Sequence, residues 1–367
     1  MIAATVPVQR PSDARLLVVD ALGRITHARR ADFVEFLRRG DLVVANDAAT
    51  LPASLQGRHV PTGREIEMRL AGRRSLAADD VEEFSAVAFG AGDFHTPTEH
   101  RPLPPPIAPG DRLALGPLRA TVTRLLGHPR LVSLHFDGSS DEIWAGLARH
   151  GRPIQYAHMT TPLALWDVWT VIAGPPVAFE PPSAGFVLDW HALAAMRARG
   201  VEFATITHAA GISSTGDAEL DARLPLDEPY DIPSSTAVAI GRALADQRRI
   251  VAIGTTVVRA LEHVASTRGY VASGSGVATQ RIDETSRLRV VDVILSGVHE
   301  PGTTHHQLLR AFAAADVLGQ ADASLAARGY RTHEFGDSVL IERPVLNEQI
   351  LSIPRTSVGF QSDRWCA

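Results

Sequence analysis

The sequence contains no lysine: all 36 of its basic residues are arginine, against 41 aspartate and glutamate residues. A chain without lysine cannot form a Schiff base, and it cannot carry the phosphate-binding loop G-x-x-x-x-G-K-[ST]. The formal net charge of −5 argues against a uniform electrostatic attraction to nucleic acid. It leaves room for a local face of arginines.

Cysteine and long apolar runs are also scarce. The single cysteine, Cys366, lies one residue from the end of the chain and can form no internal disulfide, which is typical of a reducing compartment. No apolar run approaches the roughly 18 residues of a membrane span, and the N-terminus lacks the apolar segment of a secretory signal. We therefore expect a cytoplasmic protein that spans no membrane.

Several familiar functional motifs are missing. Residues 274–276 lack the third glycine of a dinucleotide-binding loop, and residues 211–215 lack a glycine of the nucleophile elbow. His299, His305 and His306 lie close in sequence, but no H-E-x-x-H pattern or cysteine accompanies them. The sequence alone therefore predicts no metal site.

Three stretches of the chain differ in pattern. Residues 16–19, 32–39 and 42–45 are predicted as strand, helix and strand. Short strands at 66–70, 86–89, 120–125 and 131–136 then follow, separated by turns, as in a small barrel or sandwich. Strand–helix alternation resumes after residue 160, with a strand at 290–295 and a helix at 304–315 among its elements.

These patterns predict a mixed α/β main domain with an inserted small β-barrel-like domain. The main domain is discontinuous and comprises residues 1–55 and 158–345, the insertion comprises residues 56–157, and residues 346–367 form a C-terminal tail. The proline-rich stretch 102–111 fits an ordered connection between strands, although its composition also suits a polyproline ligand.

The segment VAIGTTVVRALE, residues 251–262, is the most informative in the chain. An apolar strand ends at Gly254-Thr255-Thr256, and a helix follows. The free N–H groups and partial positive charge of such a helix start suit a carboxylate or phosphate. A threonine-capped helix without any ligand is the alternative.

Polar residues follow other predicted strands as well. Asn46, Asp47, His208 and His299 each stand at or just after a strand, and Asp337 precedes one. Strand ends of this kind can converge on one edge of a sheet and form a single site, which we expect to face the insertion. A strand-end histidine can equally be a hydrogen-bonded structural residue.

Five blocks, in their order and spacing, resemble the S-adenosylmethionine:tRNA ribosyltransferase-isomerase family of queuosine biosynthesis. They are GDLVVANDAATLPASLQG, PSAG, VAIGTTVVRALE, VVDVILSGVHEPGTT and GDSVLI, between residues 40 and 341. The resemblance implies transfer of the ribosyl part of S-adenosylmethionine to the aminomethyl group of a 7-deazaguanine base in tRNA. The sugar is isomerised to an epoxycyclopentanediol, giving epoxyqueuosine, and adenine and methionine leave.

On this resemblance S-adenosylmethionine is a substrate, no cofactor is bound, and tRNA is the partner. A general base would remove a C5′ hydrogen acidified by the sulfonium. The catalytic candidates are His208, His299, Glu228 and Asp337. The candidates for substrate binding are Asn46, Asp47, Ser183, Ala184, Gly185, Gly254, Thr255, Thr256 and Arg259.

Several positions depart from the family pattern. Ala49 and Ser54 stand where the family has arginines, Val187 stands in place of a histidine, and Gly297 in place of an asparagine. Loss of arginine weakens contacts to phosphate or carboxylate. Two alternatives therefore stay open: a paralogue that uses S-adenosylmethionine on a small-molecule acceptor, and a non-catalytic nucleotide- or RNA-binding protein.

Overall fold

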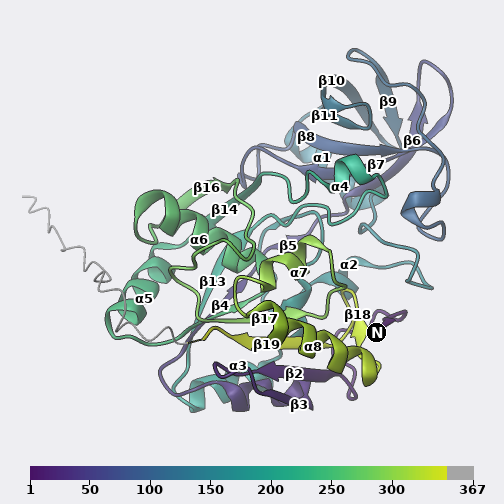
Figure 1. Ribbon diagram of the computed structural model, residues 1–367. Helices are drawn as coiled ribbons and strands as arrows, with labels where there is room; N and C mark the ends of the chain where they lie inside the picture. Colours follow the sequence, from purple (N-terminus) through teal and green to yellow (C-terminus); the bar gives the residue numbers. More distant parts are fainter. Residues whose placement is uncertain (345–367) are drawn as a thin grey trace, which may run out of the picture.

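The computed structural model describes residues 1–344 and contains a nine-stranded mixed sheet and a closed six-stranded barrel (Figure 1). The predicted fold class, a mixed α/β domain with a small β-barrel, is confirmed. The exact domain boundaries stay a prediction. The predicted tail at 346–367, with Cys366, lies outside the described residues.

The large sheet places four parallel strands at its centre. Its order is β16 (Gly274–Ala278), β14 (Glu228–Ile232), β13 (Glu202–His208), β4 (Leu42–Asn46), β15 (Ile250–Ile253), β17 (Val293–Gly297), β19 (Ser338–Glu342), β2 (Arg15–Val19) and β3 (Ile25–Arg29). Strands β13, β4, β15 and β17 are parallel to one another. Their C-terminal ends therefore meet at one edge, as the sequence predicts.

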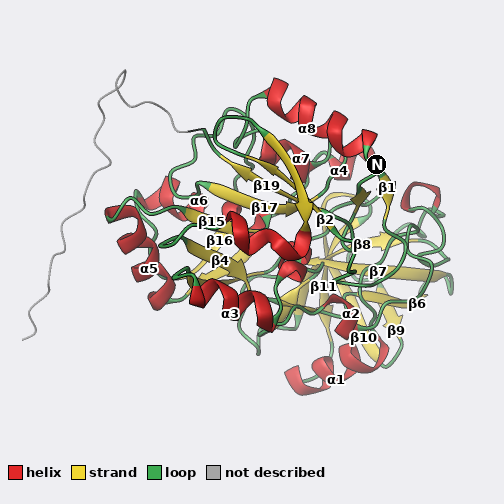
Figure 2. Ribbon diagram, turned by 90° about the horizontal axis from the view of Figure 1, so that it is seen from below, coloured by secondary structure: helices red, strands yellow, loops and turns green. Residues whose placement is uncertain are grey.

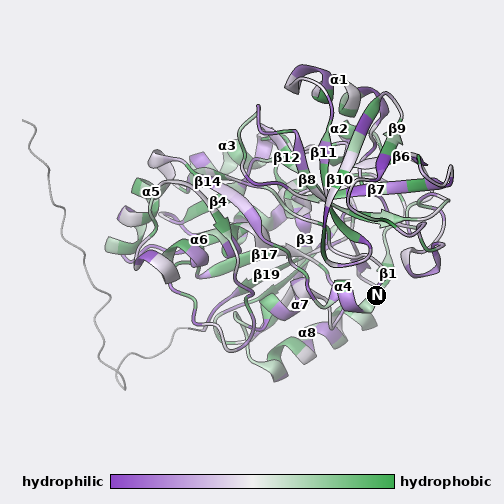
Figure 3. Cartoon of the chain, turned by 90° about the horizontal axis from the view of Figure 1, so that it is seen from above, coloured by the Kyte–Doolittle hydropathy of each residue, from purple (hydrophilic) through white to green (hydrophobic). Residues whose placement is uncertain are grey.

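The central strands are apolar because both faces of the sheet are covered. All residues of β4 and β15 are buried, which explains their continuous apolar sequence. One face packs on α5 (Ser234–Ala245), α6 (Thr255–Arg268), α7 (Thr304–Leu309) and α8 (Ala315–Ala327). The other packs on η1 (Arg30–Phe36), η3 (Ser183–Val187) and α3 (Trp190–Ala198). Figure 2 shows helices on both sides of the strands, and in Figure 3 hydrophobic residues run along the central strands.

The barrel consists of antiparallel strands and leaves no free edge. Around it run β10 (Leu118–His128), β11 (Leu131–Phe136), β8 (Glu83–Phe89), β7 (Glu65–Gly72), β6 (Ser54–His59) and β9 (Arg112–Leu115). Its apolar core continues into Ala48, Phe179 and Ala209 next to the large sheet. This shared core holds the barrel against the strand ends.

Short elements complete the described chain. The two-stranded sheets are β1 (Ile2–Ala3) with β18 (Arg331–Thr332), and β5 (Ala49–Thr50) with β12 (Pro176–Ala178). The remaining helices are η2 (Thr98–His100), α1 (Ser140–His150), α2 (Leu165–Val168) and α4 (Ala218–Asp221). Within residues 1–344, no helix is both long and apolar enough to cross a bilayer.

Three predicted elements differ from the structure. The helix expected at 32–39 is the shorter 3₁₀ helix η1, and the helix expected at 304–315 ends at Leu309 before α8 begins. The strand expected at 290 begins at Val293, because the backbone N–H groups of residues 289–291 donate to the buried Glu262 carboxylate over 2.7–2.9 Å instead of to a neighbouring strand. The apolar pattern of the sequence does not reveal that a carboxylate takes these backbone N–H groups from the strand.

A buried ion network lies on β7 of the barrel and ties it to Arg101. Glu67 accepts hydrogen bonds from Arg69 Nε at 2.8 Å, Arg101 Nη1 at 2.6 Å and the Ser54 hydroxyl at 2.8 Å. Burial opposes ionisation of Glu67, but the two guanidinium groups outweigh it and lower the pKa. Arg101 also donates to the carbonyls of Gly90 and Gly92 and thereby anchors the loop that follows β8.

Replacing Glu67 by Gln would leave two buried guanidinium groups without a counter-charge. We expect a loss of about 3–5 kcal/mol in the free energy of unfolding of the barrel, measured by urea denaturation. Glu65→Gln, an exposed position on the same strand, is the control. Equal stability of the two variants would contradict the importance of this network.

Candidate functional site

A cavity of about 530 Å³ lies where the barrel meets the C-terminal ends of the central strands. The barrel insertion contributes Thr98 and Glu99, and residues 254–256 and 296–300 come from the strand ends. The predicted site residues that line the cavity are Ser183, Ala184, Glu228, Gly254, Thr255, Thr256, Arg259 and His299. Those that do not line it are Asn46, Asp47, Gly185, His208 and Asp337.

The first turn of α6 opens onto the cavity without a side-chain cap. Its N-cap residue is Gly254, at φ 99° and ψ 152°, a conformation that residues with a Cβ rarely adopt. The N-cap is Gly254 and, within residues 1–344, no side chain accepts from the first N–H groups, so the alternative of a threonine-capped helix is wrong. The uncapped turn offers donors and partial positive charge to an anionic group.

Asn46 holds the strand ends together beneath this turn. Its Oδ1 accepts from the N–H groups of Ala48 and His208, both at 3.0 Å. Its Nδ2 donates to the His208 carbonyl at 2.9 Å and to the Thr256 hydroxyl at 3.3 Å. All four hydrogen bonds are to the protein itself, so the buried amide positions the site and has no donor left for a substrate.

A buried charged cluster lies beside the cavity. The Arg259 guanidinium pairs with Glu228 and donates to the carbonyls of Leu226, Ala278 and Gln280. Glu228 also accepts from the Gly211 N–H at 2.6 Å. Both side chains touch the cavity wall, but their hydrogen-bonding atoms are occupied by the protein.

His208 is fully buried next to this cluster. Its Nε2 lies 3.4 Å from Glu228 Oε2, yet neither ring nitrogen makes a hydrogen bond within the described residues. Burial, with a smaller contribution from Arg259, lowers the pKa of His208 to about 3. A neutral ring that does not reach the cavity gives no support to the prediction of His208 as the base.

Two predicted carboxylates are also absent from the cavity lining. Asp337 is fully buried and accepts from the Arg15 N–H and guanidinium and from the Arg331 N–H, at 2.8–3.2 Å. Asp47 accepts from the Thr207 hydroxyl at 2.7 Å. The Asp337 oxygens therefore hold β2 and β18 together, and this geometry gives no support to the predicted catalytic role of Asp337.

Three predicted substrate-binding residues, Ser183, Ala184 and Gly185, lie in η3. Ser183 and Ala184 face the cavity, whereas Gly185 is buried, and a Cβ there would lie 3.0 Å from the Thr170 methyl group. Gly185 therefore allows close packing of η3. Its neighbours, not Gly185 itself, are available to a ligand.

Four histidines line the cavity: His158, His299, His305 and His333. The rings of His299 and His305 stack with centroids 4.5 Å apart, and those of His158 and His333 stack at 4.0 Å. Burial holds the pKa of His299 well below its ordinary value, and the neighbouring histidines add to this effect. His299 is therefore a neutral ring whose Nε2 lies 3.1 Å from the Ser296 hydroxyl.

The cavity carboxylate with the most perturbed pKa, Glu180, is not among the residues predicted from the sequence. Its Oε1 accepts from the Tyr156 hydroxyl and from the Ser213 N–H, the latter at 3.0 Å. Burial raises the pKa of Glu180 to about 7, although these two hydrogen bonds act to lower it. Only its place two residues before the PSAG block could have drawn attention to Glu180.

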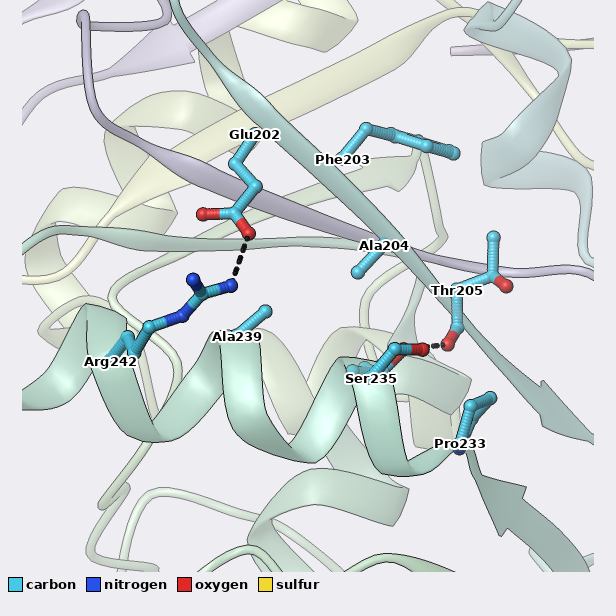
Figure 4. A pocket seen from close by; sticks show the side chains of 9 residues that line it. Glu202, Phe203, Ala204, Thr205, Pro233, Ser235, Ala239 and Arg242 are labelled. Carbon is cyan, nitrogen blue, oxygen red and sulfur yellow. Dashed lines mark hydrogen bonds and ion pairs between the residues drawn. The ribbon is translucent and has the colours of Figure 1, made fainter.

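A smaller hollow, of about 370 Å³, lies between β13 and α5 (Figure 4). Its charged residues, Glu202 and Arg242, pair with each other at 3.3 Å, and the Thr236 hydroxyl donates to the Thr205 carbonyl. It contains no histidine and none of the predicted site residues. The larger cavity is therefore the candidate active site.

Comparison with known proteins identifies the family of the chain. Residues 1–341 match the family described as queuosine biosynthesis protein. The chain is 34% identical over 364 residues to the S-adenosylmethionine:tRNA ribosyltransferase-isomerase of Sorangium cellulosum, covering 93% of this chain and 95% of that protein. It is 32% identical over 334 residues to the enzyme of the same name from Thermus thermophilus, covering 89% and 92%.

Among solved structures, the S-adenosylmethionine tRNA ribosyltransferase of Thermotoga maritima is similar, with a TM-score of 0.49 and 23% identity over 93% of this chain and 96% of that one. The family match extends over almost the whole described chain. It confirms the resemblance seen in the five sequence blocks. The chain therefore belongs to the queuosine biosynthesis protein family, that of the S-adenosylmethionine:tRNA ribosyltransferase-isomerases.

Proposed function

We propose that this chain transfers and isomerises the ribosyl moiety of S-adenosylmethionine onto a 7-aminomethyl-7-deazaguanine base in tRNA, giving epoxyqueuosine, adenine and methionine. One observation carries the proposal: residues 182–184, 254–256 and 296–299, far apart in the sequence, line a single cavity. These are segments through which the chain resembles its family. Similarity over more than nine-tenths of a named enzyme does not favour the paralogue or the non-catalytic alternative.

The α6 start suits the methionine carboxylate of S-adenosylmethionine. Its N–H groups are uncapped, Gly254 has no side chain, and Ala184 beside it is small, so an anion can approach the backbone closely. Glu180 and Glu300 on the cavity wall supply negative charge for the sulfonium. Arg281, exposed beside the same cavity, suits a phosphate of the tRNA backbone.

Glu180 is the best candidate for the base that removes a C5′ proton. Both hydrogen bonds that Glu180 accepts from the described part of the chain go to Oε1, which leaves Oε2 for the substrate. Its pKa of about 7 suits catalysis near neutral pH, because a general base is most effective when its pKa lies near the pH of the reaction. His208 and His299 are weaker bases, because burial lowers the pKa of each.

Adenine release tests the overall reaction. The protein is incubated with S-adenosylmethionine and tRNA that carries the aminomethyl deazaguanine, and in parallel with the same tRNA carrying guanine. We expect adenine only with the modified tRNA. Release without tRNA would indicate the paralogue, and binding of S-adenosylmethionine without release would indicate a non-catalytic protein.

Replacing Glu180 by Gln should lower kcat/KM by about 10²–10⁴-fold, because the proton acceptor is lost. In the unmodified protein, kcat/KM should rise with pH through about 7, as Glu180 loses its proton, and then level off. The variant should lack this rise, whereas Glu35→Gln, an exposed change on η1, should keep it. A normal pH profile in Glu180→Gln would remove Glu180 from the mechanism.

Replacing Gly254 by Ala should cost about 1–3 kcal/mol of folding free energy, because its backbone conformation is open almost only to glycine. Binding of S-adenosylmethionine, measured by calorimetry, should weaken as the helix start shifts. Gly241→Ala is the matched control, since Gly241 lies within α5 and has open space around it. Equal ligand affinity in the two variants would argue against the α6 start as the carboxylate site.

A further inference from the structure

Three cavity residues that the ribosyl-transfer proposal does not use form a compact donor set. His158, His333 and Glu334 each offer one ligand atom, and these atoms all lie within 4.8 Å of one another. His158 Nε2 lies 3.0 Å from Glu334 Oε2, and the two imidazole rings stack at 4.0 Å with an interplanar angle of 10°. All three residues line the cavity.

We propose that His158, His333 and Glu334 bind a divalent transition-metal ion, with Zn²⁺ as the best fit. Two imidazole nitrogens and one carboxylate oxygen are ligands that Zn²⁺ prefers. Neighbouring ligand atoms of a tetrahedral Zn²⁺ site lie about 3.3 Å apart, so the donors need to move little to enclose an ion.

Three protein ligands leave one coordination position free, as in catalytic rather than structural zinc sites. Because the ligands line the cavity, that position opens onto the space assigned to the substrates. At that position a bound ion would coordinate a water molecule, or an oxygen or nitrogen atom of a substrate. The side chains of His158 and Glu334 are 12% and 23% exposed, so an ion can reach them from the cavity.

The backbone at His333 gives independent support. Its φ is 70°, and Gln247 is the only other non-glycine residue with positive φ among residues 1–344. L-residues rarely adopt this conformation, and it persists where the surroundings enforce it, often at functional sites. Here it places the His333 ring parallel to that of His158.

A simple ion pair does not account for the cluster. His306 and Asp322 form such a pair at 2.9 Å elsewhere in the structure, and neither belongs to a three-ligand group in the described residues. The cluster at His158 adds a second, stacked imidazole within ligand distance. The sequence alone predicts no metal here, because His158 lies 175 residues before the adjacent pair His333 and Glu334 and the three follow no short motif.

Direct metal binding tests this proposal without reference to ribosyl transfer. The full chain, freed of metal by a chelator, is titrated with Zn²⁺ by calorimetry, and Co²⁺ is used as a spectroscopic substitute. We expect one ion per chain and the visible absorption of tetrahedral Co²⁺. His333→Asn and Glu334→Gln should each weaken Zn²⁺ binding at least about tenfold.

The variants are chosen to keep the fold. Asn tolerates positive φ, and Gln has the shape of Glu, so both substitutions remove a ligand with little backbone change. His95→Ala, which disrupts an exposed His–Asp pair, is the control and should bind Zn²⁺ normally. Circular dichroism verifies that each variant is folded. Absence of binding by the unmodified chain, or undiminished binding by the folded ligand variants, would overturn the proposal.

Discussion

The Asn46 side-chain amide is the interaction on which the geometry of the site depends. The buried Asn46 amide bonds to the N–H and the carbonyl of His208 and to the Thr256 hydroxyl. It therefore joins β4, β13 and the start of α6. Buried amides are stable only when their hydrogen bonds are made, and here the strand ends and the helix supply all of them. The relative positions of these three elements are thereby fixed before any ligand binds.

The fixed positions of β4, β13 and α6 explain how a cavity forms. Parallel strands end together, the uncapped α6 turn faces outward, and the barrel covers the opening through a core shared with the sheet. Glu67 and its two arginines hold the barrel wall, and Arg69 packs over the Tyr156 ring that bonds to Glu180. Burial and the hydrogen bond from Tyr156 act on the pKa of Glu180, so this pKa depends on the packing around the cavity. A buried carboxylate with one occupied oxygen is well placed to exchange a proton.

Some of this could be predicted from the sequence and some could not. The apolar runs of β4 and β15 and the break at Gly254 follow from local pattern, so the sheet edge and helix start were predictable. Asp337 shows the limit, because a carboxylate next to a strand looks the same in sequence whether it faces a cavity or pairs with Arg15. Glu180 and its partner Tyr156 lie 24 residues apart without a motif, and only the fold brings them together.

The orientation of bound S-adenosylmethionine is the most direct test of the whole account. In a crystal structure of the complex, we expect the methionine carboxylate within hydrogen-bond distance of the Thr255 and Thr256 N–H groups, with C5′ facing Glu180 Oε2. This position would show that the α6 start binds the carboxylate and that Glu180 can reach the C5′ proton. A ligand bound in the hollow between β13 and α5, or with its carboxylate away from α6, would contradict the account.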